Sequence, residues 1–257
     1  MTLVMAIHVN AASVNATILL PDGNVAPFAE VVVEGKSFAA DANGNVVLDV
    51  ADGVKTANVK WLSLSAELPI ASEMKLKNKL YYGAPYDQED FTVNGEDNWK
   101  IDKKSLYNPG DKEAQIFYDD SFADFVFRTK FTLDKAKDYY YLRFFFRTVE
   151  PGFNGYGLSV PNLAGYQIYF TRFEGDWNKY TALKFIAPPA KVDLEYELVV
   201  FLKNEKIEAY LRPTNEPKYN QILNIEDTSD GAYFDGGFSI MASFLEVKLT
   251  ELAVFAY

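Results

Sequence analysis

The stretch Phe125-Val-Phe-Arg-Thr-Lys-Phe-Thr-Leu133 decides the fold class, because apolar and polar side chains alternate along it. Period-two alternation is typical of a β-strand that buries one of its faces. We expect Phe125, Phe127 and Phe131 to point inward and the polar side chains between them to point outward. The stretch therefore predicts a strand with a buried aromatic face.

The same pattern continues towards the C-terminus. Further strands are predicted at 196–202, 206–212, 237–243 and 246–255. The first two are joined by Lys203-Asn-Glu205, which predicts a hairpin. Helical periodicity is scarce, and only Ser121 to Asp124 suggests a turn of helix. Residues 91–257 are therefore predicted to form an all-β domain.

Residues 14–66 predict a second, smaller β domain. Its short apolar runs are separated by Pro21-Asp-Gly-Asn24, Asp41-Ala-Asn-Gly44 and Ala51-Asp-Gly53. Such Asp-Gly and Asn-Gly pairs close tight connections between strands. The length of the segment allows about five or six strands of ordinary size, which predicts a small β-sandwich.

The remaining segments are interpreted as connections. Residues 67–90 read as a linker, because Pro69 and Gly83-Ala-Pro85 interrupt the periodicity. Residues 1–13 hold a short apolar run and small residues without a basic n-region. They are either a truncated secretory signal peptide or an N-terminal arm.

Composition narrows the function classes. The chain has 257 residues, of which 49% are hydrophobic and 24% charged, and this excludes wholesale disorder. Its net charge of −11 argues against nucleic acid as a partner, and no apolar run is long enough to span a membrane. With no cysteine and only His8, the chain lacks disulfides, thiolate nucleophiles and the histidine of a Ser-His-Asp triad within its ordered body.

The first predicted domain resembles a known accessory module. The carrying residues are Pro21-Asp-Gly-Asn-Val-Ala-Pro-Phe-Ala-Glu-Val-Val-Val-Glu-Gly35, Asp41-Ala-Asn-Gly-Asn-Val-Val-Leu48, Gly53 and Val59. In this order they resemble the carboxypeptidase regulatory-like, transthyretin-related β-sandwich. The resemblance implies a spacer or docking module rather than a catalyst.

The second predicted domain contains a further set of recognisable motifs. They are Phe91 with Asn98-Trp99, Asp124-Phe-Val-Phe127, Phe145-Phe146-Arg147, Gly165-Tyr-Gln-Ile168, Glu197-Leu-Val-Val-Phe-Leu-Lys-Asn-Glu-Lys-Ile207 and Glu246-Val-Lys-Leu-Thr-Glu-Leu252. In this order they resemble the concanavalin A-like lectin/glucanase superfamily, most closely its laminin G-like and 3-keto-disaccharide hydrolase-related branch. The resemblance implies a jelly-roll β-sandwich. It says little about function, which depends on the site that a shared fold carries.

A candidate binding face follows from alternation along residues 139–149. Tyr141, Arg143, Phe145 and Arg147 share the face opposite to the apolar side chains of this strand. Rings that pack on pyranose C–H groups, beside guanidinium groups that bind hydroxyls or carboxylates, suit a sugar-binding surface. The open alternatives are ordinary cladding of a sheet by cation–π pairs and a register that is wrong by one residue.

Neighbouring segments extend this face. Gln167, Tyr169 and Thr171 are expected to point outward on the next strand, and Lys184 follows on the strand after it. Tyr156, Trp177 and Tyr180 lie in two predicted loops that would form a rim. The predicted ligand-binding residues are thus Arg143, Phe145, Arg147, Tyr156, Gln167, Tyr169, Trp177, Tyr180 and Lys184.

A third loop gathers oxygen donors. Asp227, Asp230 and Asp235 lie within Asp227-Thr-Ser-Asp-Gly-Ala-Tyr-Phe-Asp-Gly-Gly237, and together with backbone carbonyls they are candidate Ca²⁺ ligands. Some laminin G-like modules hold calcium in this way, as the resemblance implies. Turn chemistry alone also explains the composition of the loop.

Catalysis finds little support. Glucanases of the resembling superfamily carry a Glu-x-Asp-x-x-Glu arrangement, which this sequence lacks. Glu195 and Glu197 are the nearest carboxylates on one strand face, in a region that reads as the solvated back of the sandwich. No carboxylate or histidine lies beside Arg147 and Gln167 to act as a base.

The sequence therefore predicts an all-β protein with a small N-terminal β-sandwich followed by a concanavalin A-like jelly roll. We expect non-catalytic binding of an oligo- or polysaccharide, outside the cytoplasm, in a secreted, periplasmic or cell-surface protein. A structural surface or virion protein that uses the same face as a protein interface and docks a partner through its N-terminal domain is the alternative. A glycan-cleaving enzyme is the second alternative.

Overall fold

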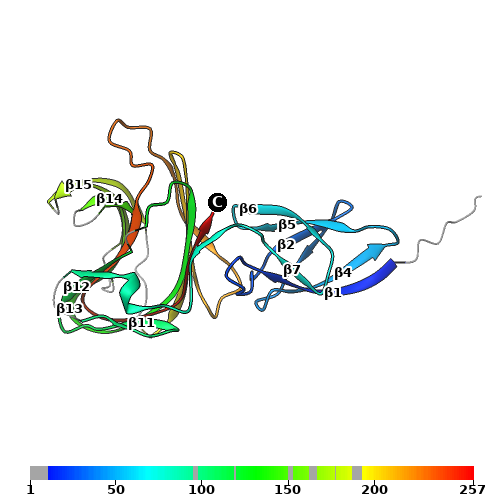
Figure 1. Ribbon diagram of the computed structural model, residues 1–257, viewed down its shortest axis with the longest axis horizontal. Helices are drawn as coiled ribbons and strands as arrows, with labels where there is room; N and C mark the ends of the chain where they lie inside the picture. Colours follow the sequence, from blue (N-terminus) through cyan, green and yellow to red (C-terminus); the bar gives the residue numbers. More distant parts are fainter. Residues whose placement is uncertain are drawn as a thin grey trace, which may run out of the picture. The chain divides into compact units, whose positions relative to one another are not determined.

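A computed structural model describes residues 11–94, 98–118, 120–149, 153–161, 167–176, 178–186 and 193–257. The chain divides into two compact units, residues 1–79 and 80–257. Strands make up both units, and the described residues form no α-helix (Figure 1). Among these residues, no helix has the length and apolar composition needed to cross a membrane. The predicted all-β class is confirmed.

The first unit consists of seven strands in two sheets. They are β1 (Ala11–Leu19), β2 (Glu30–Val33), β3 (Lys36–Ala39), β4 (Asn45–Ala51), β5 (Thr56–Trp61), β6 (Leu64–Pro69) and β7 (Glu73–Lys75). The sheet orders are β4-β1-β7 and β3-β2-β5-β6. Val46, Leu48 and Val50 are buried at every second position of β4, as the alternation predicts.

The turn at residues 41–44 illustrates the local chemistry of this unit. The Asp41 carboxylate accepts hydrogen bonds from the backbone N–H groups of Asn43 and Asn45, at 2.8 and 2.9 Å. Gly44 has a φ of +72°, and a Cβ atom there would come within 2.8 Å of the Ile18 carbonyl oxygen. Only glycine fits this close approach to β1 without strain.

The described residues of the second unit form thirteen strands and one short 3₁₀ helix. The strands are β8 (Leu80–Tyr82), β9 (Thr92–Asn94), β10 (Lys100–Ile101), β11 (Ser105–Pro109), β12 (Glu113–Tyr118), β13 (Phe125–Thr148), β14 (Asn154–Pro161), β15 (Ile168–Asp176), β16 (Lys179–Ile186), β17 (Glu195–Lys203), β18 (Lys206–Pro213), β19 (Asn220–Glu226) and β20 (Gly237–Ala256). The helix is η1 (Gln88–Asp90).

The long strands β13 and β20 run through both layers of this unit. Residues 141–146 of β13 and 238–243 of β20 form one layer with β14, β15, β16, β12 and β9, which we call the pocket sheet. Residues 125–132 of β13 and 247–256 of β20 form the other layer with β8, β10, β11, β17, β18 and β19, which we call the back sheet.

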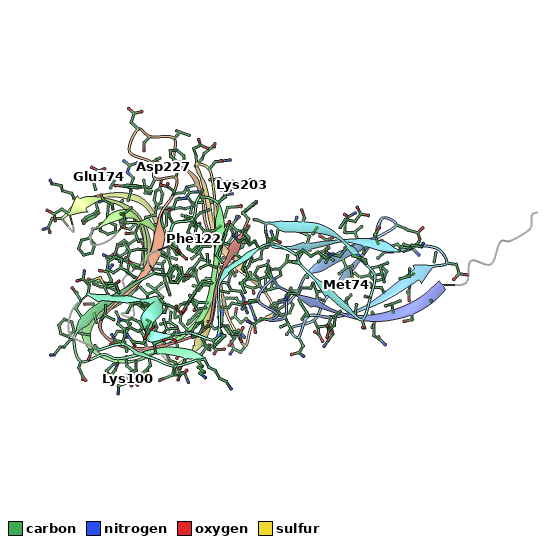
Figure 2. All side chains as sticks on the ribbon, in the orientation of Figure 1. Met74, Lys100, Phe122, Glu174, Lys203 and Asp227 are labelled. Carbon is green, nitrogen blue, oxygen red and sulfur yellow. The ribbon has the colours of Figure 1, made fainter. Side chains whose placement is uncertain are left out.

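An aromatic core lies between the two sheets. Phe127 of the back sheet contacts Phe144 and Phe146 of the pocket sheet, with ring centres 5.7 and 5.2 Å apart. Phe125, Phe127 and Phe131 are all buried, which confirms the inward face predicted for this strand. Figure 2 shows Phe122 inside the same unit. Burial of these rings removes most of their apolar surface from water and stabilises the sandwich.

Two local expectations are wrong. Residues 67–90, read as a linker, carry β7, which pairs with β1, and β8, which pairs with β20. Both strands have only three residues, too few to establish a period in the sequence. Residues 121–124 form no helical turn, and the backbone N–H of Phe122 instead donates to the Gly236 carbonyl at 3.0 Å. The predicted hairpin at 196–212 is confirmed by the pairing of β17 with β18.

Candidate functional site

A pocket opens on the outer face of the pocket sheet. Arg143 on β13 pairs with Ser159 on β14, Ser159 pairs with Tyr169 on β15, and Tyr169 pairs with Phe185 on β16. Residues at paired positions point to the same side of a sheet, so these four side chains form a row across four strands. The core-facing neighbours Leu142, Leu158 and Phe170 point the other way.

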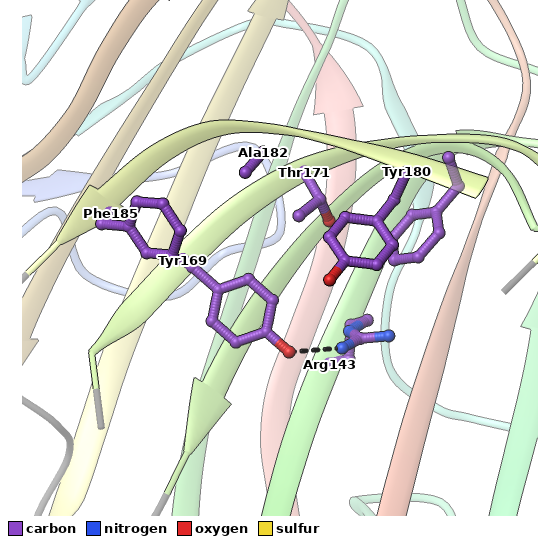
Figure 3. A pocket seen from close by; sticks show the side chains of 7 residues that line it. Arg143, Tyr169, Thr171, Tyr180, Ala182 and Phe185 are labelled. Carbon is purple, nitrogen blue, oxygen red and sulfur yellow. Dashed lines mark hydrogen bonds between the residues drawn. The ribbon is translucent and has the colours of Figure 1, made fainter. Parts of the chain in front are cut away.

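The pocket has a buried floor and exposed walls. Its volume is about 280 Å³, and its lining residues are Arg143, Tyr169, Thr171, Phe173, Tyr180, Ala182 and Phe185. Arg143, Thr171 and Phe173 are buried, whereas Tyr180 and Phe185 are 57% and 64% exposed. Figure 3 shows the Tyr169 and Tyr180 rings beside the Arg143 guanidinium.

The Arg143 guanidinium is fixed by hydroxyls and rings. Its Nε donates to Ser159 Oγ, and its Nη2 donates to the Tyr169 hydroxyl at 2.6 Å. The guanidinium carbon lies 4.6 Å from the centre of the Tyr141 ring and 5.2 Å from that of Phe173. Cation–π attraction strengthens when the cation is removed from water. The rings therefore help to stabilise the guanidinium of Arg143, which is only 2% exposed.

Gly157 on β14 makes room for this arrangement. A Cβ atom at this position would come within 2.7 Å of the Phe173 ring and 3.3 Å of Arg143 Cδ. Any side chain larger than hydrogen would therefore push against two residues of the pocket floor. Gly157 directly follows Tyr156, which the sequence analysis places in a loop, but it lies within β14 and serves packing.

A small apolar cluster borders the pocket. Tyr141, Phe145, Phe173 and Met241 pack together on the outer face of the pocket sheet, with Phe153 against them. Phe145 is therefore on the predicted face, but it is buried in this cluster rather than open to a ligand. Tyr169 on β15 and Tyr180 on β16 both line the pocket, although the sequence analysis places Tyr180 in a loop.

Arg147 is a structural residue, and its predicted place on the binding face is wrong. Its φ of +51° coincides with a register shift in β13, so alternation no longer describes where its side chain goes. Its guanidinium donates to the carbonyls of Ala123, Asn204 and Tyr233 and to the Asp124 carboxylate. Burial lowers the pKa of Arg147 from its usual value. With all of its N–H groups engaged, it has none left for a ligand.

Three further predicted residues also lie elsewhere. Tyr156, expected at the rim, belongs to the core between the sheets and stacks on Phe170 with ring centres 5.6 Å apart. Lys184 pairs with the core residue Phe170 and so points away from the pocket, on the side opposite to Phe185. Gln167 is exposed just before β15 and does not line the pocket. Trp177 lies outside the described residues.

Sequence reasoning missed Phe185 and Ala182, because an outward Lys184 would place its neighbour Phe185 on the opposite, core-facing side of the strand. A register shift between β15 and β16 leaves Leu183 as an extra residue, which packs against the core. Such a bulge moves the following side chains to the opposite face. A phenylalanine followed by Ile186 gives no indication of exposure in the sequence. Only the pairing register decides whether Phe185 faces the core or the pocket.

The predicted calcium loop is occupied by an internal ion pair. Arg172 Nη1 lies 3.0 Å from Asp227 Oδ2, and the Tyr156 hydroxyl and Ser229 Oγ also donate to the Asp227 carboxylate, at 2.9 and 2.6 Å. Burial opposes ionisation, but the hydrogen bonds from Ser229, Tyr156 and Arg172 outweigh it and lower the pKa of Asp227. Asp230 and Asp235 are exposed, and the described residues hold no group of three potential metal ligands. Ca²⁺ takes about six to eight oxygen ligands, and Asp227, the one buried carboxylate of this loop, is already engaged by Arg172.

Of the two carboxylates considered for catalysis, Glu197 belongs to a buried ion-pair network. Glu197, predicted to be solvated, is fully buried and binds Arg128 at 2.8 Å and Arg212 at 2.6 Å. Arg128 also binds Glu251, at 2.7 Å. Burial opposes ionisation of Glu197, but Arg128, Tyr219 and Arg212 outweigh it and lower its pKa. No carboxylate is among the described residues that line the pocket, so nothing there matches the acid and base of a glycosidase.

Solved structures with similar folds were found, whereas no family model and no curated protein matches the sequence. The carbohydrate binding module CBM66 from Bacillus subtilis is 17% identical, with a TM-score of 0.53 over 65% of this chain and 96% of that one. The VIP36 exoplasmic/lumenal domain with bound Ca²⁺ and Man3GlcNAc is 13% identical, with a TM-score of 0.51 over 68% and 86%.

A Bacillus subtilis protein of unknown function with a galectin-like fold is 12% identical, with a TM-score of 0.51 over 69% of this chain and 96% of that one. At these identities the likeness concerns the fold. The chain thus contains a lectin-like jelly roll, as its sequence predicts.

Proposed function

We propose that this protein binds a carbohydrate without cleaving it, in the pocket between Arg143, Tyr180 and Phe185. The observation that carries the proposal is an exposed aromatic wall around a fixed, buried guanidinium. Ring faces pack against the C–H faces of sugars, and guanidinium and hydroxyl groups bind sugar hydroxyls. The Tyr169 hydroxyl, which accepts a hydrogen bond from Arg143 Nη2, also lines the pocket and adds a polar contact that would orient the sugar.

Similar folds support this proposal. CBM66 is described as a carbohydrate binding module, and VIP36 was solved with mannose-containing ligands. The proposal includes a location outside the cytoplasm, in keeping with the description of the VIP36 domain as exoplasmic or lumenal. Calcium is not required in the proposed site, since the Asp227 loop is held by Arg172.

A glycan panel with three variants tests the proposal. We expect saturable binding of at least one saccharide, weakened about tenfold by Tyr180→Ala or Phe185→Ala, because losing an aromatic contact costs about 1.5 kcal/mol. Phe234→Ala removes an equally large ring that is 48% exposed and does not line the pocket, and it should bind like the unmodified protein. Adding calcium or a chelator should leave the affinity unchanged. No binding across the panel, or equal losses in all three variants, would contradict the proposal.

A protein interface is the second candidate for the same face. Among the described residues β16 is the last strand of the pocket sheet, with one edge that no other described strand pairs, and it exposes Tyr180 and Phe185. Exposed aromatic side chains are enriched at protein interfaces, and an unpaired edge can add a strand from another chain. Sedimentation analysis distinguishes the two: an oligomer that Phe185→Ala dissociates, with no saccharide binding, would favour the interface.

A further inference from the structure

A cluster of exposed lysines lies on the outer face of the back sheet. Lys100 on β10 pairs with Tyr107 on β11, and Tyr107 pairs with Lys248 on β20. Leu106 and Leu249, next to these positions in the chain, point into the core. The row therefore faces outward, on the opposite side of the sandwich from the pocket. Figure 2 shows Lys100 at the margin of this unit.

Two neighbouring hollows connect these lysines to the turn between β10 and β11. One has a volume of about 370 Å³ and is bordered by Lys100 and Lys248, and the other has a volume of about 630 Å³ and adds Lys103 and Lys104. Both include Asp102, Ser105 and Lys248, so they form one continuous surface. We call Lys100, Lys103, Lys104 and Lys248 the lysine patch.

The patch is positively charged in an acidic protein. The whole chain has a net charge of −11, yet the only carboxylate that lines these hollows among the described residues is Asp102. None of the four lysines lies within ion-pair distance of a carboxylate in the described part of the chain. Lys100 Nζ instead lies 5.9 Å from the centre of the Tyr107 ring. Such a concentration of one charge attracts a ligand of the opposite charge.

Asp102 shapes the patch more than it neutralises it. Its carboxylate accepts hydrogen bonds from the backbone N–H groups of Lys104 and Ser105, at 2.7 and 2.8 Å, and from Ser105 Oγ at 3.0 Å. The pKa of Asp102 is lowered most by the hydrogen bond from the Lys104 backbone, and further by those from Ser105 and by the charge of Lys248. The carboxylate thus holds the turn that presents Lys103 and Lys104. A second acidic group, Glu246, accepts the hydroxyl of Tyr107 at 2.7 Å.

The side chains between the lysines favour a sugar chain as the partner. Ser105, Thr250 and Tyr107 contribute hydroxyl-bearing side chains to the lining, and its only ring and only large apolar side chain among the described residues, Tyr107 and Ile101, are partly buried. Single-stranded nucleic acids need rings on which bases stack, and membrane surfaces need apolar side chains that insert. Lysine is a flexible point charge that binds oxyanions without a fixed fork geometry.

We propose that the lysine patch binds sulfate or carboxylate groups of an anionic polysaccharide. The two outer faces of the sandwich would then carry two separate binding sites, the pocket on one and the lysine patch on the other. The patch does not depend on sugar binding in the pocket, because no residue lines both.

The full chain is tested against dextran sulfate, polygalacturonate and neutral dextran at rising salt concentrations. We expect binding to at least one anionic polymer, none to dextran, and an affinity that falls as salt screens the charges. The triple variant K103Q/K104Q/K248Q should bind about tenfold more weakly. The variant K36Q/K55Q/K60Q, which changes the net charge equally at exposed lysines of the first unit, should bind like the unmodified protein.

Preference for dextran sulfate or for polygalacturonate identifies sulfate or carboxylate as the group that is bound. Tyr180→Ala and Phe185→Ala should leave binding of the anionic polymers intact, which separates this site from the pocket. The proposal is overturned if neither polymer binds, if both triple variants lose affinity equally, or if the protein binds anionic vesicles but neither polymer.

Discussion

Two arginines on β13 show that position, not residue type, decides a role. Arg143 follows the strand alternation and reaches the pocket floor, where rings and hydroxyls surround it. Arg147, four residues later, has a positive φ and donates to three backbone carbonyls from separate segments. Arg143 therefore lines the pocket, whereas Arg147 ties chain segments together. A guanidinium serves both uses because it carries five N–H donors in a rigid plane.

Gly157→Ala tests the packing of the pocket floor at the scale of one residue. The added methyl group would overlap the Phe173 ring and press on Arg143, so we expect a loss of about 1–3 kcal/mol in the free energy of unfolding. Saccharide affinity should fall as well, because both displaced side chains line the pocket. Urea denaturation and saccharide titration measure the two effects. Gly83→Ala is the control, since its Cβ would meet only ordinary contacts at 3.6 Å or more.

At the scale of the element, period-two alternation predicts the strands well and fails where the register shifts. It gives the inward face of β13 at residues 125–131 and the outward direction of Arg143 and Tyr169. It misplaces Lys184 and Phe185, because a bulge in β16 is decided by pairing with β15 and not by local sequence. Alternation also fails to predict that Tyr156 is buried. Its hydroxyl donates to Asp227, 71 residues away in the chain, and this hydrogen bond allows a tyrosine to lie in the core.

The loop that follows β19 is held against β14 and β15 by Asp227. Asp227→Asn would keep the shape of the side chain but remove the charge that pairs with Arg172. We expect the unfolding free energy to fall by roughly 1–3 kcal/mol, because Arg172 and the Tyr156 hydroxyl lose a charged acceptor. Hydrogen exchange should quicken at the backbone N–H of Tyr233, which donates to the Tyr156 hydroxyl at 3.2 Å.

Calcium provides the matched measurement for this loop. If Arg172 satisfies Asp227 as the geometry indicates, millimolar calcium should leave the melting temperature of the unmodified protein unchanged. A rise in melting temperature with calcium that Asp227→Asn abolishes would contradict the internal ion pair and restore the loop as a metal site.

For the whole molecule, the sequence predicts the layers and misses the buried charges. Alternating apolar residues indicate two β units, because burial of one face per strand is a property of each strand alone, and the jelly roll is what the family resemblance implies. The network of Arg128, Glu197, Arg212 and Glu251 joins β13, β17, β18 and β20. No local pattern marks it, since its members are distant in the chain and each charged side chain favours exposure when considered alone.

This network makes stability depend on pH. The pKa values of Glu197 and Glu251 are lowered in the folded protein, so the unfolded chain binds protons at these groups at a higher pH than the folded protein does. The stability that these two ionised carboxylates contribute is complete above about pH 5, where they are ionised in the unfolded chain as well. It is lost as the pH falls through their lower pKa values in the folded protein. The melting temperature should therefore drop steeply on acidification below about pH 5.

Glu197→Gln should lower the free energy of unfolding by about 3–5 kcal/mol at pH 7, because it leaves Arg128 and Arg212 buried beside a neutral group. The stability of this variant should also vary less with pH. Glu226→Gln changes an exposed carboxylate and should preserve both the stability and its pH profile. An unchanged acid profile in Glu197→Gln would show that other carboxylates control acid unfolding.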